Sequence, residues 1–358
     1  MPDVTGPIRV AQWTSGIVGI SALRAILDEP RLELVALYTH SADKRGVDAG
    51  TLAGRDPVGV TATDDVDTVL ATNPDCVVYM PHWPDIAELE RILASGVDVV
   101  TTARLVNGEY YPDDAGARLA AAARTGGSTL VGTGMNPMHV PTVALAATAM
   151  CRHVSRISIT ESMDCFMYGN TATWTGYGFG DPPDTAAIKA KLLSAEPDYP
   201  ETVSVMARAI GVEIDDVDLT VECAVALTDR DLGFIQIATG TVAGIDATWT
   251  GSRDGVPVAV LRTTWTLGSA LGHPQHPEWR LAYGYLVHIT GDPDVKLKMS
   301  FTPSDFETFD IGTTTAMPAV NAIPIVVSAP SGVFTPLDLP IITARAPRPG
   351  AHAAVDPD

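Results

Sequence analysis

Two glycines three residues apart, Gly16 and Gly19, follow a short apolar stretch at residues 8–13 and open an amphipathic stretch that ends at Leu27. Backbone N–H groups at a helix start have no partners within the helix, and the helix dipole adds partial positive charge, so such a turn can hold a phosphate. The full dinucleotide-binding fingerprint also has glycine at the position of Thr14. The turn alone is equally typical of α/β proteins that bind nothing there.

A second polar segment, residues 38–45, follows the next expected strand, where NAD-binding sites usually carry a carboxylate for the ribose. This segment instead places His40, Ser41 and Lys44 at that point. A hydroxyl and a lysine can hold an additional phosphate, so the segment favours NADP(H), with NAD(H) as the alternative cofactor. A solvated loop with incidental basic residues is the competing interpretation.

The third segment whose residues could bind a ligand is residues 132–137, GTGMNP. Its glycines allow close backbone approach, and the Asn136 amide is both donor and acceptor, which suits a carboxamide such as that of nicotinamide. A simple turn ended by Pro137 explains the same residues. The spacing does not decide between the two.

Alternating strand and helix patterns position these segments in the first 150 residues. Strands are expected at residues 8–13, 32–39, 76–80, 97–101 and 129–132, with helices at 64–72, 85–95 and 113–124. This alternation predicts a parallel sheet covered on both faces, with ligands at the carboxyl ends of its strands. Pro81, His82 and Thr102 lie at such ends and are added to the candidate cofactor contacts, as is Ser15.

From residue 151 the pattern changes to longer strands typical of a mostly antiparallel sheet. They are expected at residues 154–160, 217–225, 233–243, 256–267, 281–291 and 295–300, with a helical insert at 184–211. A final helix is expected at residues 312–327. The predicted organisation is a cofactor domain (1–150), a substrate and dimerisation domain (151–311), a helix and strand that return to the first domain (312–345), and a tail (346–358).

Composition narrows the function classes. The 358 residues carry a net charge of −20 with scattered basic residues, which argues against a nucleic-acid partner. Four cysteines without CxxC spacing indicate reduced thiols, hence a cytoplasmic protein, and the opening residues lack the pattern of a signal peptide. No apolar window of about 18 residues predicts a membrane span. A hydrophobic content of 46% fits an additional subunit interface or a wide cleft.

Three motifs, IRVAQWTSGIVG, LVGTGMNPMHVPT and AVNAIPIVVSAPSGVFTPLDLP, resemble the dihydrodipicolinate-reductase-like family, which includes 2,4-diaminopentanoate dehydrogenase and native amine dehydrogenases. The resemblance implies a Rossmann-type parallel sheet domain, an α+β substrate domain, a nicotinamide cofactor, hydride transfer to C=N or C=O, and a homodimer. Matched motif by motif, Gly16, Ile17, Val18 and Gly19 would hold the pyrophosphate, while Asn136 and Pro137 would lie beside the nicotinamide. Asn321 is a further candidate there.

The departures from that family concern the chemistry. Amine-forming relatives carry a glutamate in the loop after residue 102, where this chain has Arg104. A guanidinium cannot accept an N–H, so another group must hold the amine. Glu109, Tyr168 and His139 are the candidate catalytic residues, while Glu161 and Asp164 follow a strand and can line the cleft. A solvated loop carboxylate is the competing interpretation for Glu109.

Aromatic residues gather at positions 168–180, which we expect to form a glycine-hinged loop over the substrate. Trp174, Tyr177 and Phe179 would make an apolar pocket next to Arg104. No cluster of cations is present for a dicarboxylate, and the two histidines at 273 and 276 have no third partner for a metal. No metal is therefore expected.

These features predict an NADP(H)-preferring oxidoreductase that aminates small apolar ketones or aldehydes with ammonia, or oxidises the amine. Two alternatives remain open. One is a carbonyl or other imine reductase, favoured by the absent glutamate. The other is a non-catalytic NADP-binding regulatory protein.

Overall fold

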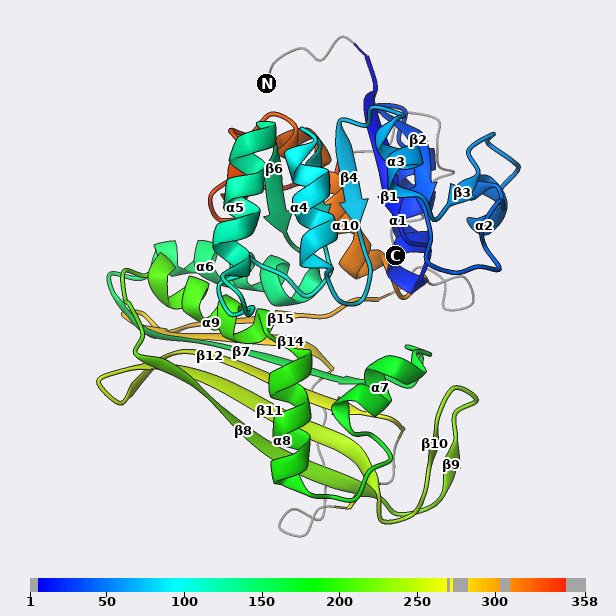
Figure 1. Ribbon diagram of the computed structural model, residues 1–358. Helices are drawn as coiled ribbons and strands as arrows, with labels where there is room; N and C mark the ends of the chain where they lie inside the picture. Colours follow the sequence, from blue (N-terminus) through cyan, green and yellow to red (C-terminus); the bar gives the residue numbers. More distant parts are fainter. Residues whose placement is uncertain (1–5, 269–270, 273–282, 303–309, 346–358) are drawn as a thin grey trace, which may run out of the picture.

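A computed structural model describes residues 6–268, 271–272, 283–302 and 310–345. The chain forms two seven-stranded sheets, one above the other in Figure 1, with helices on and between them. The histidines at 273 and 276 and the tail at 346–358 lie outside the described residues. None of the described helices is long and apolar enough to cross a membrane.

The first sheet is parallel throughout and has the strand order β16-β6-β5-β4-β1-β2-β3. Its strands are β1 (Ile8–Trp13), β2 (Leu32–Tyr38), β3 (Ala62–Thr63), β4 (Cys76–Tyr79), β5 (Asp98–Thr101), β6 (Thr129–Gly132) and β16 (Gly332–Phe334). The order reverses between β1 and β4, which opens a crevice at their carboxyl ends where ligands bind in such sheets.

Helices cover both faces of this sheet because its strands are apolar on both sides. α1 (Ile17–Asp28) and α10 (Thr313–Val326) pack on one face around Val78 and Val100, while α4 (Ile86–Ala94) and α5 (Ala115–Gly126) pack on the other around Val77 and Val99. Of two shorter helices, α2 (Ala49–Leu52) packs with α1, and α3 (Val66–Leu70) packs with the cluster of α4 and α5. The C-terminal part of the chain thus returns to the first sheet through α10 and β16.

The second sheet has the order β13-β8-β11-β12-β7-β14-β15 and is antiparallel except where β7 pairs with β12. Its strands are β7 (Val154–Asp164), β8 (Asp216–Ala226), β11 (Val242–Arg253), β12 (Val256–Thr266), β13 (Leu271–Gly272), β14 (Gly284–Gly291) and β15 (Val295–Met299). β9 (Arg230–Asp231) and β10 (Gln236–Ile237) form a separate hairpin. Together the two sheets confirm the predicted fold class.

The helices that follow β6 lie between the two sheets or, like α8, against the second sheet (Figure 1). They are α6 (Val140–Ala147), α7 (Thr171–Tyr177), α8 (Thr185–Ala195) and α9 (Asp198–Ala209), with a π-helical turn at Met135–His139 and a 3-10 turn at Thr148–Met150 before and after α6. The buried Glu201 of α9 accepts backbone N–H groups from Val106, Asn107 and Tyr110 at 2.7, 3.1 and 3.2 Å. This side chain ties the loop after β5 to α9.

Three expectations about local structure are wrong. The strand expected at 233–243 does not form, because Gly233 and Gly240 adopt φ of +81° and +82°, so β11 begins only at Val242. The helical insert breaks into α8 and α9 at Glu196, which precedes Pro197 and so leaves the helical region. The aromatic segment is not an open loop but contains α7, which is capped by Asn170 and followed by Gly178 at φ +99°.

Candidate active site

The turn between β1 and α1 is built for close backbone packing. Thr14 has φ +74°, the left-handed conformation that glycine adopts in the complete fingerprint. A Cβ on Gly19 would lie 2.5 Å from the Thr14 carbonyl oxygen, so only glycine fits there. Gly16 precedes α1 without a side-chain cap, which leaves the N–H groups of the first helical turn for a ligand. The turn therefore has the backbone geometry of the fingerprint despite its missing glycine.

A cavity of about 240 Å³ extends from this turn past the end of β2. It is lined by Thr14, Ser15, Gly16, Thr39, His40, Ser41, Lys44, Met80, Pro81 and His82. The Lys44 ammonium donates to the Ser15 carbonyl oxygen at 2.7 Å, whereas Arg45 points away in an ion pair with Asp64 at 3.0 Å. Within the described part of the chain, none of the residues lining this cavity is acidic.

A second cavity of about 330 Å³ shares Gly16, Met80, Pro81 and His82 with the first, so the two meet at the start of α1. Among the described residues, four buried polar atoms of this passage have no hydrogen-bond partner: Thr14 Oγ1, Ser15 Oγ, His82 Nε2 and Asn136 Oδ1. Burial near Arg104 lowers the pKa of His82 to about 3, so the ring is neutral. These unpaired atoms and the two joined cavities fit a nicotinamide dinucleotide.

The larger cavity holds a carboxylate beside the expected nicotinamide position. The Glu161 side chain, on β7, accepts from Asn136 Nδ2 at 2.7 Å and from Trp265 Nε1 at 3.1 Å. Burial raises the pKa of Glu161 above its usual value, although hydrogen bonds from Asn136, Trp265 and Tyr285 oppose that shift. Glu161 is only 7% exposed. It can accept an N–H from a ligand and can exchange a proton with it.

Arg104 enters the same cavity from the loop after β5 and meets two further carboxylates. Its Nη1 atom lies 2.7 Å from Glu196 Oε1 and 3.7 Å from Asp198 Oδ1, and its Nη2 atom donates to the Tyr177 hydroxyl. Burial raises the pKa of Glu196 to about 8. Buried charges in proteins are paired in this way. The arginine that departs from the family pattern therefore belongs to a compensated cluster.

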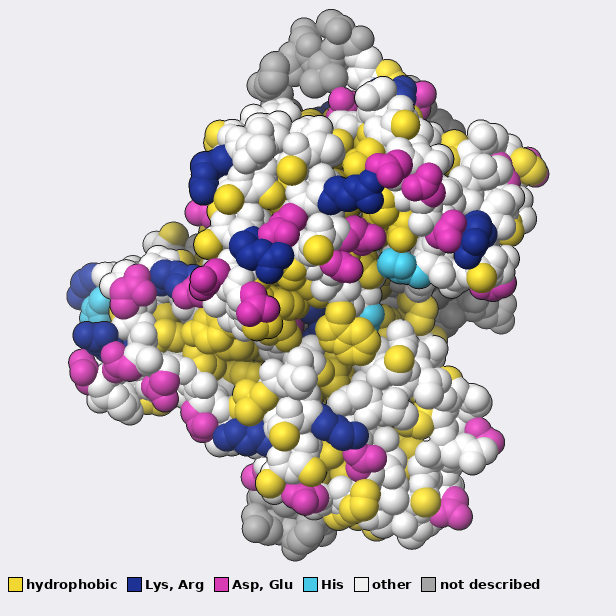
Figure 2. Space-filling view, in the orientation of Figure 1, with side chains coloured by type: hydrophobic (Ala, Val, Ile, Leu, Met, Phe, Trp, Pro, Cys, Tyr) yellow, Lys and Arg dark blue, Asp and Glu magenta, His cyan; other side chains and the backbone are white. Residues whose placement is uncertain are grey.

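Aromatic side chains form much of the remaining wall, namely Tyr168, Trp174, Tyr177, Tyr199, Trp265, Tyr285 and Phe301. Trp174 lies edge-on to Tyr168 and to Tyr177, and the Tyr177 ring stacks on Trp265 with centroids 5.4 Å apart. On the face shown in Figure 2, hydrophobic side chains gather in the hollow between the upper and lower parts of the molecule, while acidic and basic ones intermix above it.

Most predicted site residues line one of the two cavities. The larger one receives Gly16, Ile17, Val18, Pro81, His82, Thr102, Arg104, Asn136, Pro137, Tyr168, Trp174 and Tyr177. Thr14, Ser15, His40, Ser41 and Lys44 line the smaller one. Gly19 supports the turn from behind without lining either.

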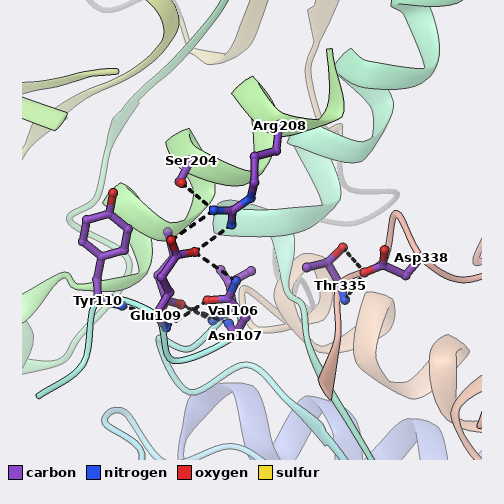
Figure 3. Close-up of polar contacts among 9 residues, drawn as sticks. Val106, Asn107, Glu109, Tyr110, Ser204, Arg208, Thr335 and Asp338 are labelled. Carbon is purple, nitrogen blue, oxygen red and sulfur yellow. Dashed lines mark hydrogen bonds and ion pairs between the residues drawn. The ribbon is translucent and has the colours of Figure 1, made fainter. Parts of the chain in front are cut away.

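Glu109 is the main correction. It lies outside both cavities, and its carboxylate forms an ion pair with Arg208 of α9 at 2.7 Å, with Ser204 bonded to the same guanidinium (Figure 3). The Arg208 partner lowers the pKa of Glu109. The competing interpretation, a solvated loop carboxylate, therefore describes the position of Glu109 better than a catalytic role does.

Three other predicted residues also fall outside the cavity linings. His139 is half-buried at the start of α6, and burial lowers its pKa. Asn321 lies on α10, but Thr314 and Thr315 of that region reach the cavity instead. Phe179 is buried behind Trp174, with ring centroids 5.3 Å apart.

Glu161 and Asp164 line the larger cavity as expected from the sequence, although neither was assigned a role there, whereas Asp198 went unnoticed. Glu161 follows Ile157 and Ile159 at alternate positions, so it occupies an inward-facing position of an amphipathic strand. A glutamate at an inward-facing position of such a strand is the sequence signal that indicates a polar group in the cavity. Asp198 stands directly after Pro197 at the start of α9, and no pattern in the sequence relates it to Arg104.

The chain is similar in sequence to known dehydrogenases and reductases. Residues 139–349 match the family model described as the 2,4-diaminopentanoate dehydrogenase C-terminal domain. The chain is 28% identical over 354 residues to an amine dehydrogenase of Streptomyces virginiae, covering 93% of this chain and 96% of that one. A 4-hydroxy-tetrahydrodipicolinate reductase of Anaeromyxobacter dehalogenans is 28% identical over 116 residues, 32% of this chain and 41% of its own length.

The fold is also similar to that of a solved structure. An amine dehydrogenase from Mycobacterium smegmatis superposes with a TM-score of 0.78 at 22% sequence identity, covering 94% of this chain and 97% of that chain. This likeness shows a common architecture for the two sheets and the helices between them.

Proposed function

The chain belongs to the family of the 2,4-diaminopentanoate dehydrogenase C-terminal domain, and on that premise we propose that it aminates a small ketone or aldehyde with ammonia, or runs the reverse oxidation. Its relatives make it an NAD(P)-dependent, amine dehydrogenase-like oxidoreductase. We propose NADP(H) as the preferred cofactor. We assign to Glu161 the role that the family glutamate holds at the position of Arg104.

The observation that carries this proposal is the pair of Glu161 and Asn136 in the wall of the cavity, 2.7 Å apart. When bound, the reduced nicotinamide supplies the hydride. The turn at residues 14–19 would hold its pyrophosphate, and the unpaired Asn136 Oδ1 atom can accept from its carboxamide. The bond to Glu161 fixes the orientation of that amide.

Glu161 then acts on the nitrogen of the substrate. As a carboxylate it accepts N–H bonds from ammonia and from the iminium that ammonia forms with the carbonyl carbon. Those bonds stabilise positive charge on the nitrogen, which makes the carbon a better hydride acceptor. The aromatic wall excludes water from the reacting carbon, and the raised pKa of Glu161 suits a group that also exchanges protons.

NADP(H) preference rests on the smaller cavity. The Lys44 ammonium and the Ser41 hydroxyl line it without an acidic residue among the described lining, so an additional phosphate meets a cation and no repelling carboxylate. The cytoplasmic location and the homodimer stay predictions from the sequence and the resemblance. The four cysteines are free, as a reducing compartment requires.

The experiment is NADPH oxidation with cyclohexanone, with and without ammonium, by the wild type, Glu161→Gln and Glu109→Gln. We expect ammonium-dependent turnover that falls about 10²- to 10⁴-fold in Glu161→Gln. Glu109→Gln is the matched control and keeps its rate, because Glu109 lies outside both cavities. Turnover without ammonium would instead identify a carbonyl reductase. Tight NADPH binding with no turnover of any carbonyl compound would identify a regulatory protein.

A further inference from the structure

One part of the wall of the larger cavity carries charged side chains that have no role in the proposed amination. Arg104 lines the cavity from the loop after β5, and Asp198, the first residue of α9, lines it beside the arginine. Asp198 is 2% exposed and its neighbour Glu196 is 1% exposed. The bound amine is already assigned to Glu161, so these groups require an explanation of their own.

The hydrogen bonds of this cluster are incomplete. Arg104 uses both terminal nitrogens, one on Glu196 Oε1 at 2.7 Å and the other on the Tyr177 hydroxyl. Its Nε atom and the Asp198 Oδ1 atom are buried, and neither has a hydrogen-bond partner within the residues that the structure describes. The 3.7 Å between Arg104 Nη1 and Asp198 Oδ1 is too long for a hydrogen bond. Glu196 Oε2 is a third buried atom without a partner among the described residues, but Glu196 does not line the cavity. Buried polar atoms are nearly always paired, so Arg104 Nε and Asp198 Oδ1 are the unpaired donor and acceptor that the cavity wall offers to a ligand.

The charge of the cluster restricts that ligand. Burial raises the pKa of Glu196 to about 8 and also raises the pKa of Asp198, while the guanidinium of Arg104 opposes both shifts. Arg104 already faces these two acids and the Tyr177 hydroxyl, so the cluster presents no uncompensated charge with which to attract a carboxylate or an ammonium group. A hydroxyl group needs no such charge, and it offers one donor and one acceptor.

We propose that Arg104 and Asp198 form a hydroxyl subsite, so that the carbonyl substrate is a hydroxy ketone and the product an amino alcohol. The hydroxyl donates to Asp198 Oδ1 and accepts from Arg104 Nε. The reaction is hydroxy ketone plus ammonia, NADPH and a proton, giving amino alcohol, NADP⁺ and water. This inference rests on the proposed amination and departs from the apolar substrates expected from the sequence. The cavity of about 330 Å³ also has to admit the nicotinamide, so the substrate chain is short.

The test compares ketones with equal numbers of non-hydrogen atoms, each with ammonium and NADPH. The pairs are 4-hydroxybutan-2-one with pentan-2-one, and 5-hydroxypentan-2-one with hexan-2-one. We expect kcat/KM to favour the hydroxy ketone in at least one pair by about ten- to a hundredfold, because the alkyl analogue leaves two buried polar atoms unpaired. Asp198→Ala should bring that ratio close to one, and the control Glu109→Gln should keep it.

Charged analogues complete the test. A higher kcat/KM for 4-oxopentanoate would assign Arg104 to a carboxylate, and a higher value for 4-(dimethylamino)butan-2-one would assign Asp198 to an ammonium group. Either result overturns the hydroxyl subsite, as does equal or better turnover of the alkyl ketones. These outcomes leave the amination intact. If no ketone is turned over, the proposed function fails and the subsite fails with it. The wild-type comparison is decisive even if Asp198→Ala does not fold.

Discussion

Thr14→Gly is expected to stabilise the protein, which is unusual for a change in a cofactor-binding turn. Thr14 has φ +74°, and a β-branched residue is a clear outlier in this region. The left-handed conformation costs an L-residue about 1–2 kcal/mol, whereas glycine adopts it freely. The greater conformational freedom of glycine in the unfolded chain offsets about 0.4–1 kcal/mol of that gain. The net stabilisation from the backbone is therefore about 0–1.6 kcal/mol, with a central value of about 0.8 kcal/mol.

The loss of the Thr14 side chain makes a second contribution to the stability of the variant. The Thr14 hydroxyl is buried without a partner among the described residues, and an unsatisfied buried polar group costs about 1–3 kcal/mol. Thr14→Ala removes this hydroxyl but keeps a Cβ in the left-handed conformation. The difference between the glycine and alanine variants therefore isolates the backbone contribution.

The assay is thermal unfolding of the cofactor-free protein, followed by circular dichroism. We expect the Tm of Thr14→Gly to be about 1–4 °C higher than the Tm of Thr14→Ala, which corresponds to a stabilisation of this size in a large chain. NADPH affinity, measured by fluorescence titration, should fall equally in both variants if the Thr14 hydroxyl contacts the cofactor. A glycine variant no more stable than the alanine variant would refute the strain that we assign to Thr14.

Two further predictions concern charge. Lys44→Ala should raise KM for NADPH at least about fivefold and leave KM for NADH within about twofold, because the ammonium in the smaller cavity would bind the additional phosphate; equal effects on both cofactors would contradict this assignment. Burial raises the pKa of Glu201 from 4.5 to about 7, so the folded protein keeps a proton that the unfolded chain releases. This stabilisation is complete below pH 4.5 and is lost as the pH rises through 7, which amounts to about 2–3 kcal/mol between pH 5 and 8. Urea unfolding at pH 5 and pH 8 measures the free energy of unfolding. Between these pH values we expect the wild type to lose about 2–3 kcal/mol more of that free energy than Glu201→Gln does. Equal losses in the two proteins would mean that Glu201 is ionised at both pH values.

Local patterns in the sequence were sufficient for the five central strands of the first sheet, but not for the short edge strand β3. β1 and β6 begin and end at the residues expected for them, because each is a short apolar run bounded by turn residues. The cofactor turn could be predicted for the same reason, since its residues are contiguous. The hairpin of β9 and β10 could not, because two glycines with positive φ interrupt a run that otherwise alternates like a strand.

The polar residues of the cavity depend on contacts that no local pattern contains. Glu161 meets Asn136 only because β7 passes below the turn that precedes α6. Glu109 was a candidate because it lies five residues from Arg104, yet an arginine 99 residues away decides its position. Sequence proximity to Arg104 thus favoured a carboxylate that lies outside both cavities, whereas the fold places Glu161 of the second sheet in the wall of the larger one.

The surroundings of Arg104 support the position that we propose for the amine-binding acid. A buried guanidinium is costly unless carboxylates compensate it, and Glu196 and Asp198 lie beside this one on the segment that joins α8 and α9. A glutamate at position 104 would place a third acid against these two and remove their counter-charge. The arginine and its two acids are therefore mutually dependent. An amine-binding carboxylate then has to come from another element, and within the described cavity wall Glu161 has the required burial and the contact with Asn136.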